Sequence, residues 1–152
     1  MKALVAYFST AGVTENIAKA IAEATGADLF EIKPEKPYTN ADINWMNPVS
    51  RCNREKIGKK DVPVASKVRN MEEYDTVFVG FPIWYGCAPN VVNTFLKGCD
   101  LKGKRIAAFA TSGGSGIGKT AEKLMPYAVG AEIVDAKVFT RADEAKDWAK
   151  GI

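Results

Sequence analysis

The chain has 152 residues, 47% hydrophobic and 26% charged, so it is long enough to bury the core of one compact domain. Its net charge of +3 is small and its basic residues are scattered, which argues against a nucleic-acid partner. It contains no histidine, which excludes Ser-His-Asp and Cys-His catalysis and histidine-ligated metals.

The cysteines and the apolar runs exclude further classes. Cys52, Cys87 and Cys99 show no paired Cys-x-x-Cys spacing, which argues against a disulfide framework or a zinc site. No apolar run approaches the roughly 18 residues that span a membrane, and the N-terminus lacks the pattern of a signal peptide. We therefore expect one domain over residues 1–152, without a membrane partner and located in the cytoplasm.

The opening of the chain predicts a strand, a tight loop and a helix. Residues 2–8 are apolar without polar alternation, which is typical of a strand buried on both faces of a sheet. Residues 9–14 are small, hydroxylated or glycine, and Ile17 and Ile21 then recur at helical spacing within residues 15–24.

This arrangement is suited to binding an anion. Free backbone N–H groups and the positive end of the helix dipole point into the loop, and the hydroxyls of Ser9, Thr10 and Thr14 are additional donors. The pattern also fits an ordinary turn in which Thr14 is the N-cap. The loop alone does not decide between the two.

Residues 27–32 predict a second strand, whose mixed polarity suits a sheet edge. Between residues 33 and 66, prolines and asparagines interrupt any long helix, although residues 49–57 predict a short one. We interpret the basic residues in this segment as a solvated face rather than as a dedicated partner site. They are Arg51, Arg54, Lys56, Lys59 and Lys60. Residues 67–74 predict a short helix leading back to the sheet.

Residues 75–81 and 105–111 are apolar throughout and predict two more buried strands. Trp84 and Tyr85 follow the first of them and precede a helix over residues 90–98. These aromatics either cap the core or offer a flat platform for a ring system, with Gly86 allowing close backbone approach.

The rest of the chain predicts a glycine-rich loop over residues 112–118, a helix over 119–127 and a fifth strand over 131–140. Thr140 and Asp143 predict the cap of a last helix. We therefore predict an α/β fold with a doubly wound, five-stranded parallel sheet in the order 2-1-3-4-5 between helical layers. A ligand is expected where the loops after strands 1, 3 and 4 gather, at the carboxyl edge.

These three loops together resemble those of flavodoxins, and the resemblance spans nearly the whole chain. Residues 9–14 resemble the FMN-phosphate loop, residues 82–86 the loop beside the flavin ring, and residues 111–116 the third flavin-side loop. The resemblance implies FMN as cofactor, electron transfer as function, and redox proteins or a small-molecule electron donor and acceptor as partners. The residues that it assigns to the cofactor are Ser9, Thr10, Ala11, Gly12, Val13, Thr14, Pro82, Ile83, Trp84, Tyr85, Gly86, Thr111, Ser112, Gly113, Gly114 and Gly116.

The sequence departs from the family pattern in ways that keep two functions open. Ala11 and Val13 stand where the family usually has Thr and Asn, and Tyr85 stands where many electron carriers have glycine. The spacing of Pro82, Gly86 and Pro89 also resembles flavodoxin-like quinone reductases. An FMN-dependent NAD(P)H/quinone-type reductase is therefore the alternative to an electron carrier, and neither requires a general acid or base.

Residues 113–120 also match the P-loop pattern G-x-x-x-x-G-K-T, in which Lys119 would bind phosphates and Thr120 a Mg²⁺ ion. Only one further strand remains to supply a second acid for Mg²⁺, and the opening loop would go unexplained. We therefore do not expect a hydrolase. A receiver domain is disfavoured because strands 1 and 3 end without acids, and a scaffold without cofactor remains a third possibility.

Overall fold

The computed structural model describes residues 2–10, 12–57, 62–112 and 116–152. Five parallel strands form a sheet in the order β2-β1-β3-β4-β5, which confirms the predicted topology. The strands are β1 (Lys2–Tyr7), β2 (Asp28–Glu31), β3 (Tyr74–Pro82), β4 (Arg105–Thr111) and β5 (Glu132–Val138). The helices are α1 (Val13–Thr25), α2 (Arg51–Ile57), α3 (Asn90–Lys97), α4 (Thr120–Leu124) and α5 (Ala142–Lys150), with 3-10 turns at Met71–Glu73 and Met125–Tyr127.

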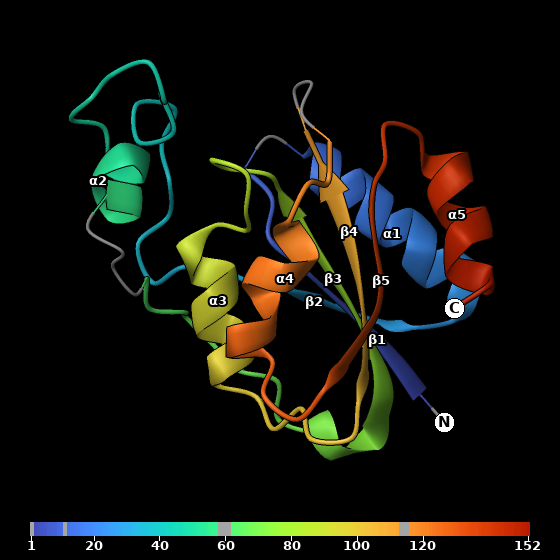
Figure 1. The fold of residues 1–152 in the computed structure, drawn as a ribbon. Coiled ribbons are helices and arrows are strands. Elements are labelled where there is room, and N and C mark those ends of the chain that lie inside the picture. The colour runs from blue at the N-terminus through green and yellow to red at the C-terminus, as the bar shows by residue number, and fades with distance from the viewer. Residues whose placement is uncertain (1, 11, 58–61, 113–115) are drawn as a thin grey trace.

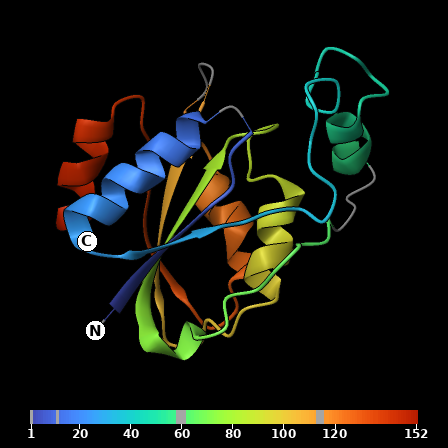
Figure 2. The same cartoon turned by 180° about the vertical axis from the view of Figure 1, so that it is seen from behind.

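Helices cover both faces of the sheet, with α1 and α5 on one face and α3 and α4 on the other (Figure 1; Figure 2 from behind). Successive strand residues point to opposite faces, so β1 supplies both layers of the core. Val5 and Tyr7 pack in the layer of α1 and α5, whereas Leu4 and Ala6 pack in the layer of α3 and α4. This double burial explains the apolar runs in the sequence.

Gly80 leaves room for the Phe109 ring over β3, in the core layer of α1. It pairs in register with Phe109, a fully buried residue of β4. The Phe109 ring occupies the place that a Cβ on Gly80 would take. A side chain at position 80 would therefore collide with the core.

The segment between β2 and β3 is long and irregular, as predicted, and α2 is the only α-helix in its described part. Its two ends are joined by an antiparallel bridge between Pro34 and Val64. Figure 1 shows α2 standing beyond α3, away from the sheet. This segment, residues 33–66, is called the excursion below.

The short helix predicted over residues 67–74 is wrong, since only the 3-10 turn Met71–Glu73 forms there. Tyr74 already has extended backbone as the first residue of β3, which leaves room for one turn. The helix predicted over residues 119–127 is also too long. Its α-helical part ends at Leu124, because Pro126 follows and cannot supply a helical N–H.

The predicted cap of the last helix is wrong as well. Arg141 is the N-cap of α5, and no side chain caps the helix. Asp143 lies in the first turn and accepts hydrogen bonds from Arg141 at 3.1 and 2.8 Å. The carboxylate still favours this helix end, through the helix dipole and that ion pair.

Candidate functional site

The loop after β1 leads into α1 through a glycine. Gly12 has a left-handed backbone, with φ 86°, and is the N-cap, so the helix begins at Val13 rather than after Thr14. The Gly12 N–H donates to the Ser9 hydroxyl at 3.1 Å. Thr10 is exposed beside it. The interpretation of Thr14 as N-cap is therefore wrong.

The N-terminus of α1 offers backbone donors to the space above the sheet. The first backbone hydrogen bond of the helix runs from the Asn16 N–H to the Gly12 carbonyl, at 3.1 Å. The N–H groups of residues 13–15 precede that bond and have no carbonyl within the helix to donate to. Ala11, also assigned to this loop, lies outside the described residues.

Thr14 joins this loop to the end of β4. It is buried, with 2% exposure, and its hydroxyl lies 2.7 Å from the hydroxyl of Thr111, the last residue of β4. Either hydroxyl can be the donor, so one hydroxyl hydrogen of the pair remains for a third group. The structure thus brings the first and third predicted loops together.

The loop after β3 forms a tight turn from Trp84 to Cys87. These two residues exchange backbone hydrogen bonds of 2.9 and 3.2 Å, and Tyr85 and Gly86 between them have φ 57° and 75°. Positive φ at both central residues is the pattern of a type I′ turn. Tyr85 is the one non-glycine residue with positive φ in the described part of the chain. That conformation costs about 1–2 kcal/mol.

Trp84 belongs to a cluster of three aromatic rings. Its ring centroid lies 5.6 Å from that of Phe8 and 5.4 Å from that of Tyr38, both edge to face. The Arg51 guanidinium lies 3.9 Å from the centre of the Tyr38 ring, and both side chains donate hydrogen bonds to Glu55. Arg51 therefore ties α2 to the first part of the excursion, and because its side chain is only 11% exposed, the predicted solvated face does not hold for it.

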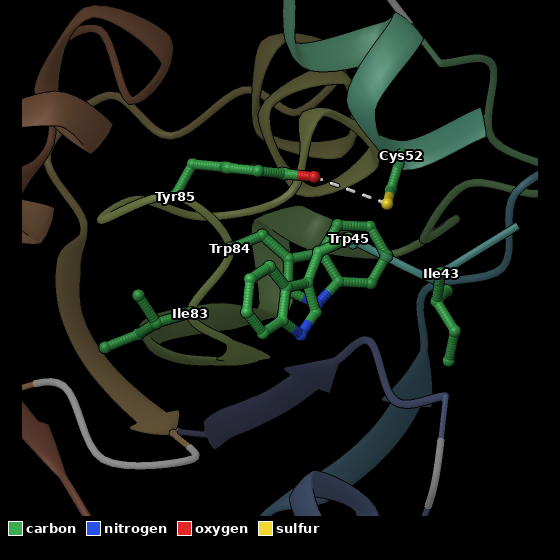
Figure 3. Close-up of a pocket in the computed structure, with 6 residues that line it drawn as sticks. All are labelled: Ile43, Trp45, Cys52, Ile83, Trp84 and Tyr85. Atoms are coloured by element: carbon green, nitrogen blue, oxygen red, sulfur yellow. Dashed lines mark hydrogen bonds between the residues drawn. The ribbon is translucent and has the colours of Figure 1, made fainter. Parts of the chain in front are cut away.

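A cavity of about 270 Å³ lies beside this cluster (Figure 3). The β3 loop and the excursion each supply part of its wall. Its lining residues are Ile43, Trp45, Cys52, Ile83, Trp84 and Tyr85. All six side chains are uncharged or apolar, so the cavity is suited to a flat, apolar ring system.

Sequence reasoning missed the half of this wall that comes from the excursion, Ile43, Trp45 and Cys52. Ile43 and Trp45 lie outside every predicted helix and strand, and Cys52 lies in the short helix predicted over residues 49–57, whose sequence indicates no site. An isolated tryptophan in a stretch rich in asparagine was the one available signal.

The Tyr85 phenol reaches across to the excursion. Its oxygen lies 3.4 Å from the Cys52 sulfur, drawn as a dashed line in Figure 3. Burial, followed by the contact with Cys52, raises the pKa of Tyr85. The phenol is therefore protonated at neutral pH and keeps a hydrogen to donate.

A second cavity, of about 460 Å³, is lined by Phe8 and Tyr38 of the aromatic cluster. The hydroxylated residues Ser9 and Thr10 contribute to its wall, as do the acids Glu31 and Glu35. The candidate phosphate loop therefore faces open space in this cavity as well.

The third predicted loop is described only in part. Thr111 is buried at the end of β4, Ser112 follows it, and Gly116 lies next to open space, whereas Gly113 and Gly114 fall outside the described residues. The structure therefore does not place the two central glycines of this loop.

The P-loop interpretation finds no support in the described part of this segment. Thr120, which would have to bind Mg²⁺, is fully buried, and its hydroxyl donates to the Ile117 carbonyl at 2.5 Å. Within the described ranges, no cluster of cysteine and acidic side chains is placed to hold a metal ion.

No helix in those same ranges is both long and apolar enough to cross a membrane.

Together, the sheet order, the α1 N-terminus and the aromatic cavity define a doubly wound α/β protein with a candidate ligand site at the carboxyl edge of its sheet. A model of the flavodoxin family matches residues 2–152, and the chain belongs to this family.

Solved structures agree with this assignment. A candidate flavoprotein from Bacteroides eggerthii is 40% identical, with 99% of this chain and 97% of that chain covered and a TM-score of 0.89. One from Bacteroides uniformis is 38% identical, with coverage of 98% and 97% and a TM-score of 0.91. A flavoprotein from Lactobacillus acidophilus, solved in complex with FMN, is 22% identical, with 98% of both chains covered and a TM-score of 0.76. At that identity the likeness shows the shared fold.

Proposed function

We propose that this protein binds FMN at the carboxyl edge of its sheet and transfers electrons through it. The observation that carries the proposal is the placement of two complementary features on neighbouring strands. Helix α1 begins after β1, and the aromatic turn of Trp84 and Tyr85 follows β3, which pairs with β1. Family membership and the FMN complex of the Lactobacillus relative support the same cofactor.

The loop after β1 fits the phosphate. No Lys or Arg occurs between Ser9 and Thr14, so the charge of the phosphate would be balanced by backbone N–H groups and the helix dipole. No atom lies within 4 Å of the place that a Cβ on Gly12 would take, so a ligand can approach the backbone there. Ser9, Thr10 and Thr14 are the hydroxyl candidates.

The cavity of about 270 Å³ fits the ring system. Trp84, Tyr85 and Trp45 would cover the ring with aromatic surface and exclude water, and Ile83 would pack beside it. Bound FMN would supply the electron-transfer chemistry, in steps of one or two electrons. The protein residues would hold and orient the cofactor, without an acid or base among them.

A NAD(P)H/quinone-type reductase is the second candidate. The uncharged lining of the cavity favours it, because no acid beside the flavin ring would oppose addition of the second electron. Oxidation of NADH or NADPH that depends on added quinone would support the reductase, and reduction of the flavin by a redox protein alone would support the carrier. A cytoplasmic location remains a prediction in either case.

Absorbance of the purified protein tests the cofactor. Protein isolated as such or soaked with FMN should be yellow, with flavin absorbance that survives desalting. A colourless protein that binds ATP with Mg²⁺ would instead support the hydrolase.

A further inference from the structure

One buried amide lies between the two walls of the aromatic cavity. Asn53 on α2 is 9% exposed, and its side-chain nitrogen donates to the carbonyls of Trp45, at 2.9 Å, and of Asn47, at 2.7 Å. Its side-chain oxygen accepts a hydrogen bond from the Tyr85 hydroxyl. Both amide hydrogens and the amide oxygen are therefore used.

These bonds connect the two elements that form the cavity. Trp45 lines it from the excursion, and Tyr85 lines it from the β3 turn. The excursion backbone at Trp45 and the Tyr85 side chain are thus held by the same group. Asn53 therefore links the two walls on either side of the space for a ring.

The turn needs an external restraint. The left-handed backbone of Tyr85 is energetically unfavourable for a residue with a side chain. The Tyr85 ring is partly exposed, so the protein holds this side chain mainly at its hydroxyl. Without a hydrogen bond to its hydroxyl, Tyr85 would favour a backbone conformation with negative φ. That change would alter the turn and the position of Trp84.

We propose that Asn53 is a positioning residue of the flavin site, which fixes the width of the ring cavity by tying Tyr85 to the backbone at Trp45. The proposal rests on the proposed FMN site and extends it to a residue that does not line the cavity. Asn53 acts on the ring alone, since its contacts are with the aromatic cavity and not with the loop after β1.

Titration with FMN and with riboflavin separates ring contacts from phosphate contacts, because the two ligands share the ring and differ in the phosphate. The Asn53→Ala variant should bind both ligands about tenfold more weakly, with the ratio of the two dissociation constants unchanged. Tyr85→Phe keeps the ring and loses the hydroxyl, and should weaken both by about threefold. The double variant should bind little more weakly than Asn53→Ala, because the bond between Asn53 and Tyr85 is lost in both and only the weak contact of the Tyr85 hydroxyl with Cys52 is lost in addition.

Tyr74→Phe is the matched control. Its phenol donates to Asp28 at 2.7 Å, near the start of β3 and far along the strand from the cavity, so this variant should bind both flavins as the parent does. Two results would overturn the proposal. One is an Asn53→Ala variant that binds FMN more weakly but riboflavin as the parent does. The other is a double variant whose loss of affinity equals the product of the two single losses. If Asn53→Ala does not fold, flavin binding by Tyr85→Phe is compared with that by Tyr74→Phe. Equal binding by these two variants would overturn the proposal.

The restraint is also measurable without flavin, which separates it from the proposed function. In the ligand-free protein, amide hydrogen exchange over residues 43–49 and at Tyr85 should be faster in Asn53→Ala than in the parent. Unchanged exchange would overturn the role of Asn53 even if FMN binds. A parent protein that binds neither flavin, with exchange faster in the variant, would overturn the flavin role and leave Asn53 as a restraint on the turn.

Discussion

The Thr14 hydroxyl lies 2.7 Å from the Thr111 hydroxyl, 97 residues further along the chain, where α1 begins and β4 ends. This bond sets the distance between the first loop of the site and the third. It also means that Thr14 has two roles to separate, one in the fold and one toward a phosphate.

Thr14→Val removes the hydroxyl and keeps the shape of the side chain. The Thr111 hydroxyl then loses a buried partner, so we expect the free energy of unfolding to fall by about 1–3 kcal/mol in a denaturant titration. If Thr14 also donates to the phosphate, FMN binding should weaken by roughly 1–3 kcal/mol while riboflavin binding stays the same.

Thr111→Val is the matched control, because it breaks the same bond and leaves the Thr14 hydroxyl in place. It should lower stability equally and weaken FMN binding less. FMN titrations that do not change in Thr14→Val would show that the phosphate lies elsewhere.

The capping of α1 illustrates what the sequence could not reveal. Threonine has a side-chain oxygen that can accept a hydrogen bond from the first turn of a helix, so a pattern-based prediction favours Thr14 as the N-cap. In the structure, a partner distant in sequence holds the Thr14 hydroxyl, and Gly12 takes the left-handed conformation that starts the helix. Tertiary contacts of this kind leave no local signal.

The sheet order was predictable because buried and edge strands differ in composition. β1 and β4 are almost entirely apolar, whereas β2 and β5 alternate with charged residues. The excursion wall of the cavity was not predictable. The Arg51 and Asn53 side chains hold it through hydrogen bonds to the backbone carbonyls of Lys36 and Trp45, which no periodicity encodes.

Gly80→Ala should destabilise the protein by about 1–3 kcal/mol, because the new methyl group would overlap the Phe109 ring in a close-packed core. Thermal or denaturant unfolding measures the change. Combining it with Phe109→Leu should cost less than the sum of the two single changes.

Gly98→Ala is the control, since a Cβ there would meet no atom closer than 3.5 Å. It should leave stability nearly unchanged. Equal losses in Gly80→Ala and Gly98→Ala would contradict the packing argument.

The excursion should become less stable in acid through Asp42. Its carboxylate accepts the Thr39 N–H at 3.0 Å, and that hydrogen bond is the main reason why the pKa of Asp42 lies below its usual value of 3.8. A lowered pKa in the folded state means that the carboxylate stabilises the fold above about pH 3.8. That contribution is lost as the pH falls through the lower folded-state pKa.

Asp42→Asn should therefore show faster hydrogen exchange over residues 39–47 than the parent at pH 6, and the difference should shrink toward pH 2 once the intrinsic pH dependence of exchange is removed. Asp147→Asn, on the exposed surface of α5, is the control. A difference that stays constant from pH 6 to pH 2 would contradict the role of the charge.

The uncharged cavity has a consequence for the reduction potential of bound FMN. Fully reduced flavin is an anion, so acids near the ring disfavour addition of the second electron, and no acid lines this cavity. We therefore expect a less negative second potential than in flavodoxins whose flavin is surrounded by acids. Ile43→Glu should move it in the negative direction. A unit charge about 10 Å away, at an effective dielectric constant near 20, is worth roughly 1.7 kcal/mol or about 70 mV.

Ile43→Gln separates charge from shape, because the glutamine has nearly the same size as the glutamate and no charge. Spectroelectrochemical titration at pH 7 should give Ile43→Gln a second potential near that of the parent and Ile43→Glu one lower by tens of millivolts. Added salt should shrink the gap between the two variants, since ions screen a partly exposed charge. A parent potential already as negative as that of Ile43→Glu would mean that other charges dominate the site, and it would favour the plain low-potential carrier over the quinone reductase.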